Sequence, residues 1–410
     1  MPRFEPFSAL RYAPDIDLDL ATAPPYDVLS SADVDVLQHR HPTNITYLDV
    51  PRASAPSSES GHGQAVDSQL DTDPYLHVAD LLQQWQDTGT LVSDLQPSYT
   101  LYRMQFVDEL GVGRQTVGVL GALEVVDDGA PGVLPHERTT PKAKTDRLDL
   151  TRATNANLSP VWGLSLAAGL TALLRDHGDP VGSCTDDDGV IHSVERVSDP
   201  VRIDAIRSAV QAHTVLIADG HHRYAISRTY RDEQRQSHPD NAGAELTLTY
   251  VAELIEDQLT IDAIHRLYSG VPLRDLLDRL ALSFEIQPAG MVDVSFAQQV
   301  VDRGSLCLVL DDGSGMWLTP RPEAFPGIRS LDGALLEHAL ADLDGLGVDY
   351  QHGVTQVVDR VRLQQAVAGV LIRPTSIDEI RRTANERLLM PPKSTFFTPK
   401  LRTGFVIRPM

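Results

Sequence analysis

The residues best suited to chemistry follow one another as Asp219-Gly220-His221-His222-Arg223, a stretch named the 219–223 motif below. The apolar run at positions 214–218 precedes it and predicts a buried strand. Glycine permits a sharp turn, and the pattern after it predicts a helix from about His222. Backbone N–H groups at a helix N-terminus, two imidazoles and a guanidinium together favour binding of an anion such as phosphate.

Asp219 could play several roles at the end of that strand. Its carboxylate could orient a histidine, bind a metal ion such as Mg²⁺ or accept a proton. It could also do no more than cap the helix, because aspartate is common at that position. Capping does not need two histidines and an arginine on the same turn. We therefore interpret the motif as a phosphate site, with Asp219 and His221 as candidate catalytic residues and Gly220, His222 and Arg223 as binding residues.

A second charged run reads His136-Glu137-Arg138-Thr139-Thr140 and continues through Lys142 to Arg147. Cations on either side keep a carboxylate ionised, so Glu137 is a candidate general base. Lys142 and Arg147 are candidates for binding phosphate or carboxylate. A solvated charge run on a loop is the alternative. The histidines do not have His-Glu-x-x-His spacing, which makes metal binding by them the weaker hypothesis.

Two smaller groups are further candidates. The pair His265-Arg266 follows a predicted strand and could line the same pocket, or could be a chance pair on the surface. Lys393-Ser394-Thr395 offers a cation and two hydroxyls, and an extended structural tail is the alternative there. The chain contains no P-loop sequence, no Gly-x-Gly-x-x-Gly and no Gly-x-Ser-x-Gly, so those three classes of site have no support.

Composition limits the class of protein. The 410 residues exceed one ordinary core and predict two domains. A net charge of −22 repels the DNA backbone and anionic lipid, although an acidic surface can also serve solubility alone. Two cysteines exclude a disulfide framework. Without a signal-peptide pattern or a membrane-spanning apolar run, we expect a cytoplasmic protein that binds a small molecule, with no nucleic-acid or membrane partner and with a homodimer left open.

Hydrophobic periods and turn signals predict an α/β protein whose elements position these residues. Residues 98–106 and 114–126 predict a hairpin. We expect a catalytic domain at residues 1–270, with an N-terminal extension and a flexible loop at 51–73. An α+β lobe should follow at 271–385, and an extended tail at 386–410 should pack back on the body.

Five motifs, in order along nearly the whole chain, resemble those of the bacterial domain-of-unknown-function family 1015. They read PFSALRY (6–12), APPYDV (23–28), PHERT (135–139), ADGHHRY (218–224) and MPPKSTFF (390–397). The resemblance implies a mixed-sheet core like that of the ParB/sulfiredoxin-like superfamily, which includes free-serine kinases, with an additional α+β lobe.

By this resemblance, Glu137 is the base on a hydroxyl, while Asp219, His221, His222 and Arg223 hold the donor phosphate and its Mg²⁺. The remaining candidates for phosphate or substrate binding are Tyr26, Asp27, His136, Arg138, Thr139, Lys142, Arg147, Gly220, His265, Arg266, Lys393, Ser394 and Thr395. The hypothesis is a phosphotransferase acting on free L-serine with ATP, ADP or pyrophosphate as donor. The alternatives are a sensor of nucleotides or phosphometabolites without turnover, and a phosphate-ester hydrolase.

Overall fold

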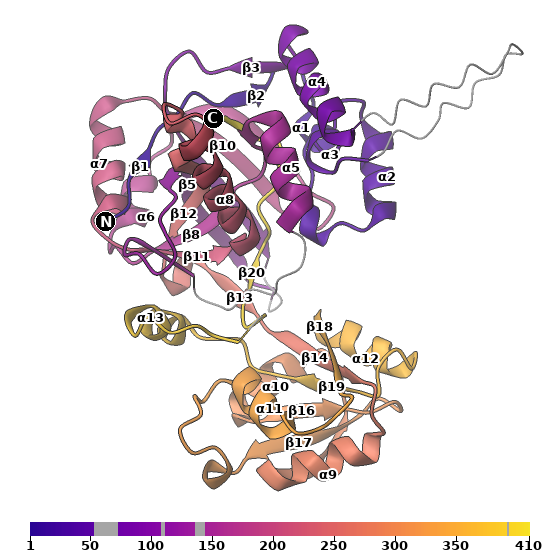
Figure 1. Ribbon diagram of the computed structural model, residues 1–410. Helices are drawn as coiled ribbons and strands as arrows, with labels where there is room; N and C mark the ends of the chain where they lie inside the picture. The colour runs from indigo at the N-terminus through magenta and orange to yellow at the C-terminus, as the bar shows by residue number, and fades with distance from the viewer. Residues whose placement is uncertain (53–72, 108–110, 136–143, 392) are drawn as a thin grey trace, which may run out of the picture. The chain divides into compact units, whose positions relative to one another are not determined.

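The computed structural model describes residues 1–52, 73–107, 111–135, 144–391 and 393–410, which form two compact units (Figure 1). Unit 1 comprises residues 1–52, 73–107, 111–135, 144–258 and 399–410. Unit 2 comprises residues 259–391 and 393–398. Unit 2 is therefore an insertion, because the chain leaves unit 1 after Gln258 and returns to it at Pro399. Among the described helices, none combines the length and the apolar character that crossing a bilayer would require.

Unit 1 is built on a nine-stranded sheet with the strand order β6-β11-β8-β12-β5-β4-β10-β9, and β1 pairs with β5. Its strands are β1 (Phe4–Glu5), β4 (Tyr99–Val107), β5 (Gly113–Glu124), β6 (Val133–Pro135), β8 (Val161–Ser165), β9 (Asp179–Thr185), β10 (Ile191–Val197), β11 (Val215–Asp219) and β12 (Leu246–Glu253). The pairs β6–β11 and β8–β12 are parallel, and the other pairs are antiparallel. The predicted mixed α/β fold is thus confirmed.

Helices and short strands complete unit 1. Its α-helices are α1 (Leu18–Ala21), α2 (Ser31–Arg40), α3 (Thr46–Asp49), α4 (Pro74–Asp87), α5 (Lys144–Thr154), α6 (Leu170–Leu174), α7 (Pro200–Gln211) and α8 (His221–Ser237). Short 3-10 helices are η1 (Tyr26–Val28), η2 (Ala242–Glu245) and η3 (Glu256–Gln258). Two strand pairs stand apart from the main sheet: β2 (Leu10–Tyr12) with β3 (Leu91–Ser93), and β7 (Ala156–Asn157) with β21 (Arg408–Pro409).

Two apolar clusters hold unit 1 together. The first joins alternate residues of the sheet, such as Val117 and Val119 of β5, to helices α6 and α7 and to Tyr224 of α8. The second joins the N-terminal segments to α4, α5 and Ile407 near the C-terminus. Burial of such apolar surface is the main force that stabilises a domain. The second cluster thus ties the two ends of the chain into the same unit.

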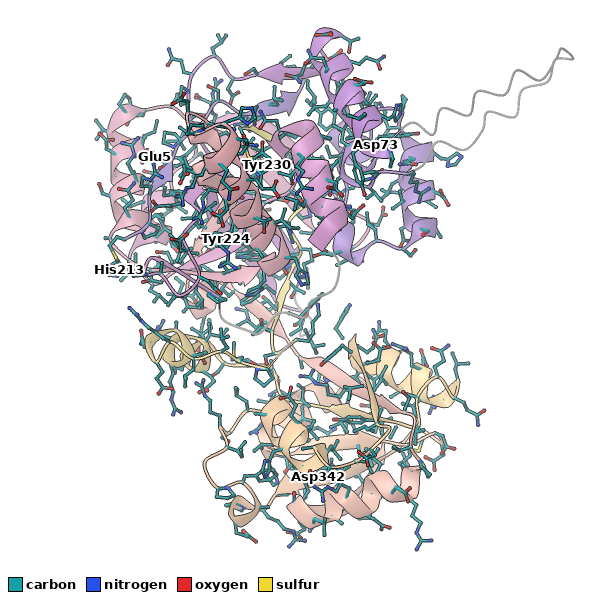
Figure 2. The ribbon with its side chains drawn as sticks, viewed as in Figure 1. Glu5, Asp73, His213, Tyr224, Tyr230 and Asp342 are labelled. Atoms are coloured by element: carbon teal, nitrogen blue, oxygen red, sulfur yellow. The ribbon has the colours of Figure 1, made fainter. Side chains whose placement is uncertain are left out.

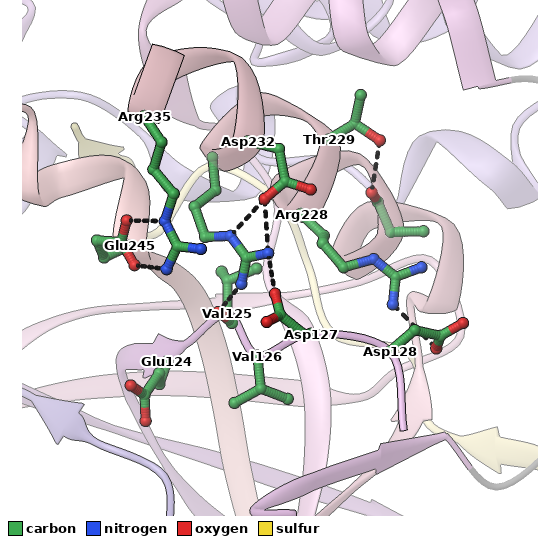
Figure 3. A network of polar contacts seen from close by, with 12 residues as sticks. Glu124, Val125, Val126, Asp127, Asp128, Arg228, Thr229, Asp232, Arg235 and Glu245 are labelled. Carbon is green, nitrogen blue, oxygen red and sulfur yellow. Dashed lines mark hydrogen bonds and ion pairs between the residues drawn. The ribbon is translucent and has the colours of Figure 1, made fainter. Parts of the chain in front are cut away.

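Side chains on one face of helix α8 hold it against the sheet of unit 1. Tyr224 and Tyr230 lie on this helix (Figure 2). The Tyr224 hydroxyl donates to the Glu124 carbonyl at 3.0 Å and accepts from the Val126 N–H at 2.8 Å. Two turns beyond Tyr224, Arg231 is buried and donates to the Val125 carbonyl and, at 2.6 Å, to Asp127. Val125 and Asp127 are labelled in Figure 3. These bonds hold the helix that begins in the 219–223 motif.

The last twelve residues, 399–410, form a segment named the C-terminal strap, which runs through unit 1. Its backbone is paired at three places: Thr403 with Ala23, Ile407 with Leu10, and β21 with β7. Residues 401–408 are all buried. A segment so paired and covered is part of the core of unit 1.

Unit 2 contains a six-stranded antiparallel sheet with the strand order β15-β17-β16-β19-β14-β18. The strands are β14 (Ile264–Ser269), β15 (Phe284–Met291), β16 (Leu306–Val309), β17 (Ser314–Pro320), β18 (Gly347–His352) and β19 (Ala368–Leu371), and β13 (Thr260–Asp262) pairs separately with β20 (Phe396–Thr398). The helices are α9 (Leu273–Ser283), α10 (Phe296–Arg303), α11 (Asp332–Leu340), α12 (Val354–Arg362) and α13 (Ile377–Asn385), with the 3-10 helix η4 (Pro322–Ala324).

Both faces of the unit 2 sheet are covered by apolar clusters. On β14, Leu267 belongs to one cluster and the next residue, Tyr268, to the other. His265 and Arg266 lie within this strand, and each is only 4% exposed. The pair does follow the predicted strand, which is β12 (Leu246–Glu253), but it lies within a further strand of its own. The alternative of a surface pair is wrong.

Candidate functional site

The 219–223 motif forms a strand–turn–helix. Strand β11 ends at Asp219, and α8 begins at His221 with Gly220 as its N-cap. Gly220 has φ +80°, a conformation that a Cβ atom disfavours. A Cβ there would also lie 3.0 Å from Nε of Arg223 and 3.3 Å from Cα of Val161. Glycine at this position thus lets the Arg223 side chain lie close over the turn.

Asp219 is not the N-cap residue of the helix, which is Gly220. Its Oδ2 atom instead lies 3.3 Å from Nζ of Lys400 and 3.5 Å from Nη2 of Arg223. Burial acts to raise the pKa of Asp219, but Lys400, Arg223 and His221 outweigh it, and the pKa lies well below its usual range. Asp219 is therefore a carboxylate at neutral pH, held between two cations.

Arg223 joins the motif to the N-terminal part of the chain. Its Nη2 atom lies 3.5 Å from Oδ2 of Asp27 as well as from Oδ2 of Asp219. Its Nη1 atom donates to the carbonyl of Pro160. The side chain is only 10% exposed, so its charge lies where electrostatic interactions are stronger than in water.

A small polar pocket of about 50 Å³ adjoins Arg223. Tyr26, Asp49, Arg147 and Ser227 also line it. Arg147 lies 3.2 Å from Oδ1 of Asp49, and its guanidinium carbon is 3.8 Å from the centre of the Tyr26 ring. Burial raises the pKa of Asp49, although Arg147 and Arg223 act in the opposite direction. The pocket has room for a few water molecules, or for one small group of a ligand.

The structure thus brings together Tyr26, Asp27 and Arg147 with the 219–223 motif, all within unit 1. Among the predicted site residues, His136, Glu137, Arg138, Thr139 and Lys142 lie outside the described residues. The roles of His221 and His222, both half-buried in the first turn of α8, stay predictions.

The other predicted residues belong to unit 2. Nδ1 of His265 accepts the Ile372 N–H at 3.1 Å, and Nη1 of Arg266 donates to the Lys393 carbonyl at 3.2 Å. The Ser394 hydroxyl donates to the Pro391 carbonyl at 2.8 Å. Thr395 is buried. Arg266 and Ser394 also line a cavity of about 240 Å³ within unit 2. These contacts give the residues structural roles in unit 2, and their predicted role in phosphate binding stays a prediction.

The described donor set fits a resident Mg²⁺ poorly. Magnesium takes about six oxygen ligands, usually including one or two carboxylates. Asp219, the carboxylate expected to hold it, already forms ion pairs with Lys400 and Arg223. Within the described ranges, no three His, Cys, Asp or Glu side chains come together as a metal site. These contacts do not favour Asp219 as a ligand of Mg²⁺, and its role in metal binding stays a prediction.

Two residues of this site were missed by the sequence analysis. Lys400 lies just after the MPPKSTFF motif, and a lysine following Pro399 in a tail expected to pack back on the body was the available signal. Asp49 sits at the end of the four-residue helix α3, where no pattern in the sequence marks it. Both reach the site through packing of segments far apart in the chain.

Comparison with known proteins assigns the chain to a family. Residues 4–334 match the family described as "Protein of unknown function (DUF1015)", and the chain belongs to that family. This confirms the resemblance found in the motifs. No curated protein matches the chain.

Several solved structures show a distant likeness. A conserved hypothetical protein from Pyrococcus furiosus is 12% identical, and the match covers 68% of this chain and 92% of that protein, with a TM-score of 0.38. A free serine kinase in complex with AMP is 13% identical over 67% of this chain and 89% of its own, with a TM-score of 0.36. SbnI with a C-terminal truncation from Staphylococcus aureus is 12% identical, and the match covers 70% of this chain and 87% of the SbnI chain, with a TM-score of 0.39. At these scores the likeness carries no argument about function.

Proposed function

We propose that the protein is a phosphotransferase that transfers a phosphoryl group to the hydroxyl of a small molecule, with free L-serine as the first acceptor to test. The observation that carries the proposal is the meeting of Arg223, Lys400 and Asp219 at the start of α8. A guanidinium and an ammonium at a helix N-terminus suit a phosphate group, whose charge they neutralise. Phosphoryl transfer needs little beyond such positioning and charge stabilisation.

In the proposed reaction the acceptor hydroxyl oxygen forms a bond to the terminal phosphorus of the donor. The bond from that phosphorus to the bridging oxygen breaks, and the shortened donor leaves. The hydroxyl proton passes to a base, for which Glu137 is the candidate on the family motifs. ATP, ADP and pyrophosphate all carry a terminal phosphoryl group of this kind, and each would enter as its magnesium complex.

The test is to incubate the full-length protein with L-serine, Mg²⁺ and each donor in turn, and to measure O-phosphoserine by mass spectrometry. Arg223→Met should lower kcat/KM by about a hundredfold, the usual effect of removing one charge-stabilising donor. Arg175→Met is the matched control, because Arg175 is an exposed arginine of the same unit. If the wild-type protein gives no phosphoserine with any donor at millimolar substrates, serine is not the acceptor.

Two other outcomes would favour the alternative functions. Release of free phosphate that does not depend on any acceptor would favour a hydrolase. Tight nucleotide binding without turnover would favour a sensor, above all if Glu137→Gln left the affinity unchanged.

A further inference from the structure

The C-terminal strap delivers a cation to the 219–223 motif. Lys400 is the second residue of the strap, and its Nζ atom lies 3.3 Å from Oδ2 of Asp219. The Lys400 side chain is 18% exposed and that of Asp219 is 27% exposed. The ion pair is thus screened from bulk water on most sides but still reachable. A ligand that enters the motif would meet the ammonium group directly.

The strap holds this lysine in place within a few residues. Two residues on, the N–H of Arg402 donates to the Tyr102 hydroxyl at 2.9 Å. The guanidinium of Arg402 donates to the Thr22 hydroxyl and to the Thr22 carbonyl, both at 2.8 Å. Arg402 is 7% exposed. The backbone next to Lys400 is therefore fixed, which lowers the entropy lost when its ammonium group binds a ligand.

Asp219 serves two cations at once. Its Oδ2 atom lies 3.3 Å from Lys400 and 3.5 Å from Arg223. Oδ2 of Asp27 lies at the same distance of 3.5 Å from Nη2 of Arg223, so two carboxylates and two cations meet here among the described residues. The Asp27 side chain is 40% exposed, more than that of Asp219 at 27%. A phosphate oxygen placed between the ammonium and the guanidinium would form charge-assisted hydrogen bonds to both.

We propose that Lys400 is a ligand-binding residue, which contacts the phosphate group of the bound molecule together with Arg223, while Asp219 positions the two cations. This inference rests on the proposed function only in taking the ligand to carry a phosphate group. It concerns binding and does not depend on which acceptor is used or on whether turnover follows.

The test measures the affinity of the full-length protein for inorganic pyrophosphate and for ATP by calorimetry. Lys400→Met should weaken both affinities by about tenfold or more, the usual cost of one charge-assisted hydrogen bond. Lys400→Arg should keep affinity within a few-fold of wild type, because it restores the charge. Raising the salt concentration should weaken binding less in Lys400→Met than in wild type, an effect that a purely structural role would not produce.

Arg274→Met is the matched control, since it removes one positive charge at an arginine that is 88% exposed in unit 2. Thermal melting checks that each variant is folded, and Lys400→Gln replaces Lys400→Met if the latter does not fold. Unchanged affinity in the folded neutral variant would overturn the inference, and so would a wild-type protein that binds neither pyrophosphate nor ATP. Weakened binding in a protein that makes no phosphoserine would support the inference while the proposed function fails.

Discussion

Arg147 links helix α5 to the N-terminal part of unit 1 through Tyr26. Its guanidinium carbon lies 3.8 Å from the centre of the Tyr26 ring, a cation–π contact. The same guanidinium donates to the carboxylate and the carbonyl of Asp49, whose side chain is only 4% exposed. Arg147 therefore neutralises a buried carboxylate and holds one wall of the pocket beside Arg223.

Replacing Arg147 should destabilise the protein strongly. Arg147→Met leaves Asp49 buried without its cation, and breaking a buried ion pair from one side costs about 3–5 kcal/mol. In urea unfolding, the double variant Arg147→Met/Asp49→Asn should recover part of that loss, because it removes the stranded charge. If the two single effects simply add, the ion pair does not carry the predicted free energy.

Replacing Gly220 with a larger residue should displace the Arg223 side chain. Gly220→Ala places a residue with a Cβ at φ +80°, which costs about 1–2 kcal/mol, and its methyl group meets Nε of Arg223. Gly189→Ala is the matched control, since Gly189 has φ +78° with nothing within 4 Å of the added Cβ. Thermal melting should show a larger loss for Gly220→Ala, and pyrophosphate affinity should fall in that variant alone. Equal losses of stability and affinity in the two variants would mean that the turn does not position Arg223.

Much of the strand–turn–helix at the motif could be predicted from sequence. The apolar run 214–218 became β11, and α8 begins at His221, one residue before the predicted start. The hairpin also formed, as β4 and β5. These features depend on local periodicity and on a glycine that can adopt positive φ, and both are visible in a single sequence.

Packing decided the features that sequence did not reveal. Helix α5 (Lys144–Thr154) arose from a charge-dense run without a clear apolar period, and it is held by contacts such as Arg147 with Asp49. His265 and Arg266 are buried in β14 because apolar clusters cover both faces of that sheet. Neither face of the strand is exposed to solvent, so the strand lacks the alternation of polar and apolar residues that a half-exposed strand shows. Lys400 reaches Asp219 only because the chain returns to unit 1 after unit 2. Such long-range contacts leave no local pattern in the sequence.

The arginines of α8 should contribute unequally to stability (Figure 3). Arg231 has a side chain only 2% exposed and bonds Asp127 and Asp232 at 2.6 Å each, so Arg231→Met should cost about 2–4 kcal/mol. Arg228 pairs with Asp128 at 2.9 Å, but that aspartate is 85% exposed. Arg228→Met should therefore cost less than about 1 kcal/mol, as surface pairs do. Urea unfolding of the two variants measures the difference, and similar losses would contradict this ranking.

His265 should make unit 2 less stable as the pH falls. Burial, followed by the neighbouring charges of Arg266 and His352, lowers the pKa of His265 to about 3, whereas an unfolded histidine titrates near its ordinary value of about 6.5. Between these two values the unfolded chain binds a proton that the folded protein does not. The contribution of His265 to the free energy of unfolding is fully present above about pH 6.5. It is lost as the pH falls towards 3, by up to about 1.4 kcal/mol per pH unit.

The measurement is the free energy of opening of β14 at about pH 7 and about pH 5, from hydrogen exchange of its backbone amides. His265→Asn removes the titrating group and keeps an oxygen that can accept the Ile372 N–H. The variant should be less stable at neutral pH if its fit is poorer, yet it should lose less stability between the two pH values than wild type does. The prediction concerns the change in the free energy of opening between the two pH values, and not its absolute value at either pH. Parallel pH dependences in the two proteins would show that His265 does not titrate with the lowered pKa.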